Sequence, residues 1–168
     1  MEAIFNRRSI RKYEDRPIEK EKIEKILRAA MQAPSAANQQ PWEFLVIEDK
    51  EILKKLAQTS PYSKMVATSA VTFVLLARKD GLLAPGCVPQ DMGAASENLL
   101  LQAVELGLGA VWLGVASIDE RMSYIKNLFK LPDNIEAFAI IPVGYPDGQE
   151  NKFVDRFDKE RVHYESYK

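Results

Sequence analysis

Arginine residues are concentrated near the start of the sequence in a pattern that suits anion binding. Arg7, Arg8 and Arg11 lie close together, and the hydroxyl of Ser9 stands between them. Because a planar guanidinium group forms paired, charge-assisted hydrogen bonds, two or three of these groups could converge on one phosphate. The alternative for such a cluster is a solvated basic surface, and the cluster alone does not separate the two.

A second segment with the character of a binding loop runs from Pro34 to Trp42, with the sequence PSAANQQPW. It is polar, rich in small residues and bracketed by prolines, and it lies between a predicted helix and a predicted strand. Loops of this kind often hold ligands on a rigid scaffold.

Metal-dependent and nucleophilic catalysis find little support in the composition. The chain has one histidine, His163, and one cysteine, Cys87, whereas a metal site needs several ligands and a nucleophile needs a base beside it. The glycines at 107 and 109 lack the spacing and the lysine of phosphate-binding loops, and they end a predicted helix where a phosphate site would begin one. An enzyme of this composition is expected to take its chemistry from a bound cofactor.

The length, composition and net charge of the chain narrow the class of protein further. At 168 residues and 46% apolar composition, the chain is expected to form one globular domain. A net charge of -1 argues against nucleic acid or an anionic membrane as partner. The single cysteine, the charged N-terminus and the lack of a long apolar run predict a cytoplasmic protein with no signal peptide and no membrane span.

Apolar periodicity predicts the elements that must position these segments. Helices are expected over residues 2–7, 19–33, 50–58, 91–106 and 119–130, and strands over 43–48, 70–77, 110–115 and 136–144. Asp49 and Asp119 are expected to be helix N-caps, and residues 80–89 are expected to form a loop. This alternation predicts a three-layer α+β or α/β domain.

The helix expected over residues 91–106 is apolar on nearly every face, which is typical of a buried helix. Its early turns carry only small residues from Gly93 to Ser96. We therefore expect it to pack on its own sheet and on a partner subunit; an ordinary core helix in a monomer is the alternative. The apolar run from Ala110 to Val115 that follows is expected to be a central strand.

The last 20 or so residues are charged and yet contain Phe153, Phe157, Tyr164 and Tyr167. A segment with spaced aromatic residues has no core of its own to join. Docking on a second subunit would explain these residues, and a disordered tail is the alternative.

Four motifs, in order over nearly the whole chain, resemble those of the nitroreductase family of FMN-dependent oxidoreductases. They are RRSIR at 7–11, PSAANQQPW at 34–42, Gln90-Asp91 leading through the apolar helix to Trp112-Leu113-Gly114, and DRFD at 155–158 with VHY at 162–164. The resemblance implies an α+β fold, a three-layer α/β/α arrangement with a mixed central sheet. It also implies one domain over residues 1–168, an intertwined homodimer, and an arm over residues 150–168 that docks on the partner.

The resemblance further implies an FMN site at the subunit interface. Residues that would bind the phosphate and ribityl chain are Arg7, Arg8, Ser9, Arg11 and Arg156; those that would line the ring from the other subunit are Pro34, Ser35, Ala36 and Asn38. Lys64 would lie near N1 and the C2 carbonyl, where a positive charge stabilises reduced flavin. Leu113 and Gly114 would present backbone to the ring, with a main-chain N–H toward N5, and glycine permits that close approach.

The reaction that the resemblance implies has two steps and needs no catalytic side chain. NADH or NADPH would give hydride to N5 of FMN, and a nitroaromatic, quinone or similar small acceptor would then take the electrons in the same pocket. Two alternatives keep the flavin: a flavin reductase, dehalogenase or flavin-fragmenting relative, and a flavin-binding or regulatory dimer without turnover. The compact loop at 80–89 departs from longer members of the family and leaves the covering of the pocket open.

Overall fold

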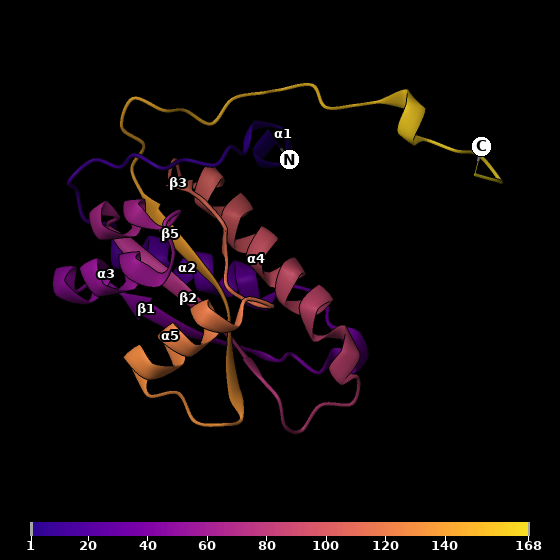
Figure 1. Cartoon of the computed structure of the whole chain (residues 1–168). Coiled ribbons are helices and arrows are strands. Elements are labelled where there is room, and N and C mark those ends of the chain that lie inside the picture. The colour runs from indigo at the N-terminus through magenta and orange to yellow at the C-terminus, as the bar shows by residue number, and fades with distance from the viewer. Residues whose placement is uncertain (1, 168) are drawn as a thin grey trace.

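The computed structural model describes residues 2–167, so Met1 and Lys168, the ends of the predicted domain and arm, lie outside the described residues (Figure 1). The helices are α1 Glu2–Asn6, α2 Lys20–Met31, α3 Lys50–Leu56, α4 Val88–Glu105 and α5 Asp119–Phe129, and the strands are β1 Trp42–Ile47, β2 Val71–Arg78, β3 Gly109–Ala110, β4 Leu113–Gly114 and β5 Ile135–Gly144. Short helical turns at Ala36–Asn38, Ala57–Thr59, Lys64–Thr68, Pro85–Cys87 and Lys159–Arg161 complete the described elements.

One sheet in the order β1-β2-β5-β3 forms the middle of the molecule, and β4 also pairs with β5. All of these strand pairs are antiparallel. Among the described strands the sheet is therefore antiparallel and not mixed as expected; the parallel pairing of Ser9 with Ala110 is an isolated bridge outside the strand pairs. The α+β class is confirmed.

Two apolar clusters lie on opposite faces of the sheet, which confirms the three layers. Alternate residues of β2 supply both: Phe73 and Leu75 face α2 and α4, whereas Val74 and Leu76 face α3 and α5. This alternation follows from the two-residue period of a strand. The sheet is therefore covered on both sides, and β2 is buried along almost its whole length.

The run from Ala110 to Val115 was expected to be a central strand, and that expectation is wrong. The run lies along the outer side of β5 and pairs with it in two short pieces, β3 and β4. The interruption falls opposite Ile141 and Pro142, and Pro142 has no N–H for the ladder. The central strands are β2 and β5.

The two predicted caps have different outcomes. Asp49 caps α3, because its side chain accepts hydrogen bonds of 2.9 Å from the backbone N–H groups of Glu51 and Ile52. Asp119 does not cap α5, since the N-cap position is Ile118. Asp119 instead stands in the first turn, where a negative charge favours the helix dipole. The expected loop at 80–89 ends early, because α4 begins at Val88.

The helix α4 lies along one side of the molecule (Figure 1). Its sheet-facing residues are buried, but Gly93, Ala94, Glu97 and Leu101 are only partly covered. It therefore packs on the core with one face and is partly exposed on the other. None of the helices between residues 2 and 167 has the length and apolar character that a membrane span requires.

The C-terminal segment leaves the body as an extended arm. It crosses over α1 and runs well past the other elements (Figure 1). Its aromatic side chains are among the most exposed in the described chain: Phe157 is 79%, Tyr164 82% and Tyr167 90% exposed.

Candidate functional site

The N-terminal arginines precede a segment that is fixed along the outer edge of the sheet. Ile10 donates a backbone hydrogen bond of 3.0 Å to the carbonyl of Ala110 in β3. The hydroxyl of Tyr13 donates to the carbonyl oxygens of Ile10 (2.7 Å) and Pro142 (3.2 Å). The backbone that carries the arginines is therefore held by β3 and β5.

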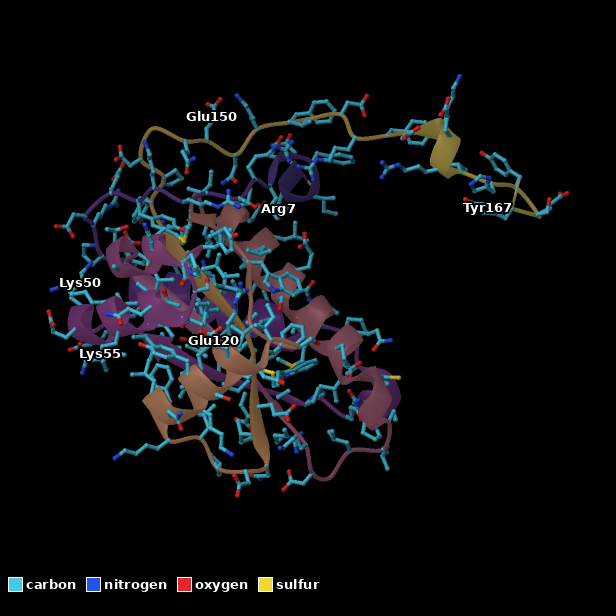
Figure 2. All side chains as sticks on the ribbon, in the orientation of Figure 1. Arg7, Lys50, Lys55, Glu120, Glu150 and Tyr167 are labelled. Carbon is cyan, nitrogen blue, oxygen red and sulfur yellow. The ribbon has the colours of Figure 1, made fainter. Side chains whose placement is uncertain are left out.

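Arg7, Arg8 and Arg156 line one cavity of about 260 Å³, between α1 and the start of the arm. Arg7 lies beside α1, below the arm (Figure 2). The Nε of Arg7 lies 3.4 Å from a carboxylate oxygen of Glu97 in α4. The structure therefore brings together three of the five residues that were predicted to hold a phosphate.

Arg8 provides the clearest sign of a missing anionic partner. Its Nε is buried and has no hydrogen-bond partner among residues 2–167, although its Nη groups donate to the carbonyls of Phe5 and Arg7. Burial lowers the pKa of the Arg8 guanidinium, and the positive charges of Arg156 and Arg7 lower it further. Because a buried donor without a partner is costly, this cavity suits an anion with several acceptor oxygens.

The other two predicted phosphate ligands, Ser9 and Arg11, do not line this cavity. The Nη1 of Arg11 donates to the carbonyl of Ser9 at 3.3 Å. Two residues that the sequence did not single out tie this segment to the chain near the arm: the side chain of Asn151 accepts from the backbone N–H of Arg8 at 3.0 Å, and that of Gln149 accepts from the N–H of Arg11 at 2.6 Å.

The predicted binding loop from Pro34 to Trp42 has an unusual backbone. Ala37, Asn38 and Gln40 have φ values of 49°, 51° and 44°, in the left-handed region that non-glycine residues rarely adopt. The hydroxyl of Ser35 accepts from the N–H of Gln40 at 3.0 Å. Such strain persists only where surrounding contacts impose it, and it is typical of ligand-binding sites.

The contacts that hold this loop come from three other segments: the helix α4, the loop before it, and the end of β2. Asp91 of α4, which is 4% exposed, accepts from the N–H of Ala36 at 2.9 Å and from Nε2 of Gln39 at 2.6 Å. Gln39 also exchanges two hydrogen bonds with the backbone of Ala84. Arg78 at the end of β2 donates to the carbonyls of Gln39 and Gln40. The sequence signal for this frame was available: an aspartate at the start of an apolar helix, and a glutamine between two prolines.

Lys64 is exposed and lines a second cavity, of about 630 Å³, together with Arg121. Arg121 comes from the first turn of α5, and its Nη1 donates to the carbonyl of Gly114 at 2.8 Å. Sequence reasoning missed Arg121. Two cations therefore border this cavity, and one of them fixes the backbone of β4.

Gly114 itself is exposed and borders a third cavity, of about 490 Å³, with the aromatic pair Trp112 and Phe138. Leu113 precedes it in β4 and is partly buried. Gly114 is four positions after Ala110, which pairs with Ser9, so at most about 14 Å of extended backbone lies between them. The arginine cavity and the backbone of β4 thus follow the same edge of the sheet.

The predicted residues do not form one pocket within a single chain. The arginines, Lys64 and Gly114 border three different cavities, and residues 34–38 line none of the three. Within the described part of the chain, no three His, Cys, Asp or Glu side chains gather as a metal site would require.

Comparison with known proteins identifies the family. Residues 4–61 and 58–145 match the family model described as "Nitroreductase family". A protein of Methanothermobacter thermautotrophicus named "Putative NADH dehydrogenase/NAD(P)H nitroreductase" is 44% identical over 99% of this chain and 87% of its own length.

Solved structures agree in fold. A crystal structure named as a "Putative NADH Oxidase" from Clostridium acetobutylicum is similar with a TM-score of 0.97 and 54% identity, over 98% of this chain and 99% of that one. An "FMN-dependent Nitroreductase" from Clostridium difficile has a TM-score of 0.92 and 34% identity, over 99% and 100% of the two chains. Since the family model covers most of the sequence and the relatives are oxidoreductases by name, the chain is an oxidoreductase that belongs to the nitroreductase family.

Proposed function

We propose that this protein is an FMN-dependent oxidoreductase that uses NADH or NADPH to reduce a small acceptor such as a nitroaromatic or a quinone. The observation that carries the proposal is Arg8, whose buried Nε has no partner within the described chain and which lines a cavity with Arg7 and Arg156. The names of similar proteins support it, since one is called an FMN-dependent nitroreductase and another an NADPH-flavin oxidoreductase.

The phosphate of FMN fits the arginine cavity by charge and by hydrogen bonding. Arg7, Arg8 and Arg156 supply a surplus of positive charge there, and a phosphate dianion offers acceptors for it. Ser9 and Arg11 follow directly along the chain and extend the cradle toward the ribityl chain. The Nε of Arg8 would gain the partner that it lacks within this chain.

The ring of FMN fits farther along the same edge, at β4. FMN, when bound, accepts a hydride from the nicotinamide and passes two electrons to the acceptor, with donor and acceptor using one pocket in turn. Leu113 and Gly114 present backbone there, and Arg121 holds the carbonyl of Gly114 in place. Lys64 contributes a positive charge that favours the electron-rich reduced ring.

A homodimer would complete the pocket. Pro34, Ser35, Ala36 and Asn38 would then line the site of the partner subunit. The partly exposed face of α4 and the exposed aromatic residues of the arm at 150–168 support this, because both leave apolar surface uncovered in the single chain. A reducing, cytoplasmic setting suits a chain with a single cysteine.

The visible spectrum of the freshly purified protein tests the proposal. A yellow protein that bleaches rapidly under anaerobic mixing with NADH or NADPH, and regains its colour with a nitroaromatic or a quinone, is the expected result. A yellow protein that neither nicotinamide bleaches would be a flavin-binding module without turnover. A colourless protein that fails to take up added FMN would overturn the proposal, and a flavin-loaded single subunit in sedimentation would overturn the dimer.

A further inference from the structure

Gln39 and Asp91 form a buried polar junction that joins three segments of the chain. Gln39 is 8% and Asp91 4% exposed, and Nε2 of Gln39 lies 2.6 Å from Oδ2 of Asp91. The other carboxylate oxygen, Oδ1, accepts from the N–H of Ala36 at 2.9 Å. Gln39 therefore connects its own loop to α4 through a charge-assisted hydrogen bond.

The remaining contacts of Gln39 reach a different loop. Its Nε2 donates to the carbonyl of Ala84 at 3.0 Å, and its Oε1 accepts from the N–H of Ala84 at 2.9 Å. This pair of bonds resembles the pairing of two strands, with an amide side chain in place of one backbone. Ala84 directly precedes the helical turn Pro85–Cys87, which leads into α4.

The junction also lies inside the strained part of the binding loop. Asn38 and Gln40, on either side of Gln39, both have left-handed backbone conformations, as does Ala37. A non-glycine residue in that region costs about 1 kcal/mol or more, so three of them in four residues need external support. Gln39 and Asp91 supply that support on the side of α4, and Arg78 supplies it on the side of β2.

We propose that Asp91 and Gln39 are a positioning pair that couples the shape of the loop 34–42 to the order of the loop 80–87. The inference rests on the proposed function, in which residues 34–38 line the flavin ring. Because coupling between two sites is reciprocal, flavin binding then orders the loop 80–87, and loss of the junction weakens flavin binding. The junction thereby joins the flavin pocket to the segment that precedes α4.

The hydrogen-bond donors and acceptors at the junction can be removed or exchanged by substitutions at Gln39 and Asp91. Gln39→Met keeps the length of the side chain and removes all three of its hydrogen bonds. In Asp91→Asn, the new amide N–H group faces the N–H group on Nε2 of Gln39, so two donors meet and their hydrogen bond is lost. If the Gln39 amide turns over to restore that bond, its N–H group faces the backbone N–H of Ala84 instead, and the bond to Ala84 is lost. In the double variant Asp91→Asn/Gln39→Glu, the new amide donates to the new carboxylate, and the bond from Ala84 N–H is kept. Only the bond to the Ala84 carbonyl stays lost.

The experiment is titration of the full-length apoprotein with FMN, combined with hydrogen–deuterium exchange of the peptide that covers residues 80–87. For the wild type, FMN is expected to slow exchange in this peptide. Each single variant is expected to raise the Kd for FMN about tenfold or more, and to speed exchange at 80–87 whether or not FMN is present. The double variant should recover part of the affinity. Gln32→Met, at an exposed position after α2, is the matched control and should match the wild type.

The results separate this inference from the proposed function. If the wild type binds FMN but either single variant binds it equally well, the positioning role is wrong and the proposed function stands. The same holds if FMN leaves exchange at 80–87 unchanged in the wild type, or if the double variant binds FMN no better than Asp91→Asn while near-ultraviolet circular dichroism shows it folded. If the wild type takes up no FMN, both fail together.

Discussion

Gly109 and Gly144 lie opposite each other in the pairing of β3 with β5, and each leaves space that one side chain of the N-terminal segment fills. A Cβ atom on Gly109 would lie 2.6 Å from Cβ of Ile10, and one on Gly144 would lie 2.8 Å from Cβ of Tyr13. Real Cβ contacts are never this short, so the two glycines are what allows residues 10–13 to lie flat on the sheet.

Gly109→Ala is therefore expected to push Ile10 away from the sheet. Overpacking of this kind costs about 1–3 kcal/mol of unfolding free energy, and it shifts the arginines that precede Ile10. Urea unfolding and FMN titration of the same variant measure the two effects. Gly86→Ala is the matched control, because a Cβ at Gly86 meets nothing within 4 Å; equal stability of the two variants would contradict the close approach.

Arg7→Ala should remove one charge-assisted contact to the phosphate. Such a bond contributes roughly 1.5–3 kcal/mol, so FMN affinity is expected to fall about ten- to a hundredfold. The protein should then purify largely without flavin. Arg28→Ala, which removes an exposed pair with Glu24 on α2, should keep its flavin, and full FMN occupancy in Arg7→Ala would place that residue outside the cradle.

Arg8→Met is expected to separate binding from stability. The variant loses FMN affinity in the same way, but it also removes a buried donor that lacks a partner and that two other arginines repel. The unfolding free energy of the apoprotein should therefore stay the same or rise. A clear fall in apoprotein stability would contradict this, and would show that the Nη bonds of Arg8 to the carbonyls of Phe5 and Arg7 outweigh the cost of its unpaired Nε.

Glu19 should make stability depend on pH in the acid range. The hydrogen bond from the hydroxyl of Tyr145 is the main cause that lowers the pKa of Glu19 from 4.5 to about 2, with help from the charges of Lys22 and Arg16. Since the pKa falls on folding, the contribution of Glu19 is present above about pH 4.5 and is lost as the pH falls toward 2.

Urea unfolding of the wild type and of Glu19→Gln across this range measures the effect. The difference between the two proteins should be largest above pH 4.5 and should shrink as the pH falls toward 2. Glu24→Gln, which breaks an exposed pair with Arg28, should cost only about 0.3–0.5 kcal/mol. A difference for Glu19→Gln that is constant from neutral pH down to pH 2 would contradict the lowered pKa.

Truncation after Lys152 should affect both association and flavin binding. It removes the exposed aromatic residues of the arm and Arg156, but it keeps Asn151, which accepts from the N–H of Arg8. Sedimentation is expected to show a weaker dimer, and titration a weaker affinity for FMN. Arg156→Met in the full chain should lower only the affinity for FMN, and a truncated protein that still sediments as a tight dimer would exclude the arm from the interface.

Local signals in the sequence were sufficient for most of the secondary structure. Asp49 caps α3 as predicted, and the apolar run around β2 is buried as predicted. The central strand was misassigned because a run such as 110–115 does not show which neighbour it pairs with. Its split lies opposite Pro142, more than two dozen positions farther along the chain.

The candidate site was predicted in residue types but not in its supporting contacts. Arg7, Arg8 and Arg156 share a cavity, and that they bind the phosphate of FMN stays a prediction. Arg121, Asn151 and Gln39 were missed, since their roles come from contacts of side chains with particular backbone carbonyls, those of Gly114, Leu108 and Ala84. Periodicity and composition carry no information about such contacts.

Ser9 pairs with Ala110 in β3, and β3 pairs with β5. The position of the first arginines of the chain therefore depends on β5, a strand that is synthesised much later. On the ribosome these arginines emerge almost at once, yet the edge that holds them cannot form until Gly144 has left the exit tunnel. Flavin should therefore load after synthesis is nearly complete. Stalled nascent chains that end before Gly144 are expected to stay colourless, and chains released at full length to turn yellow.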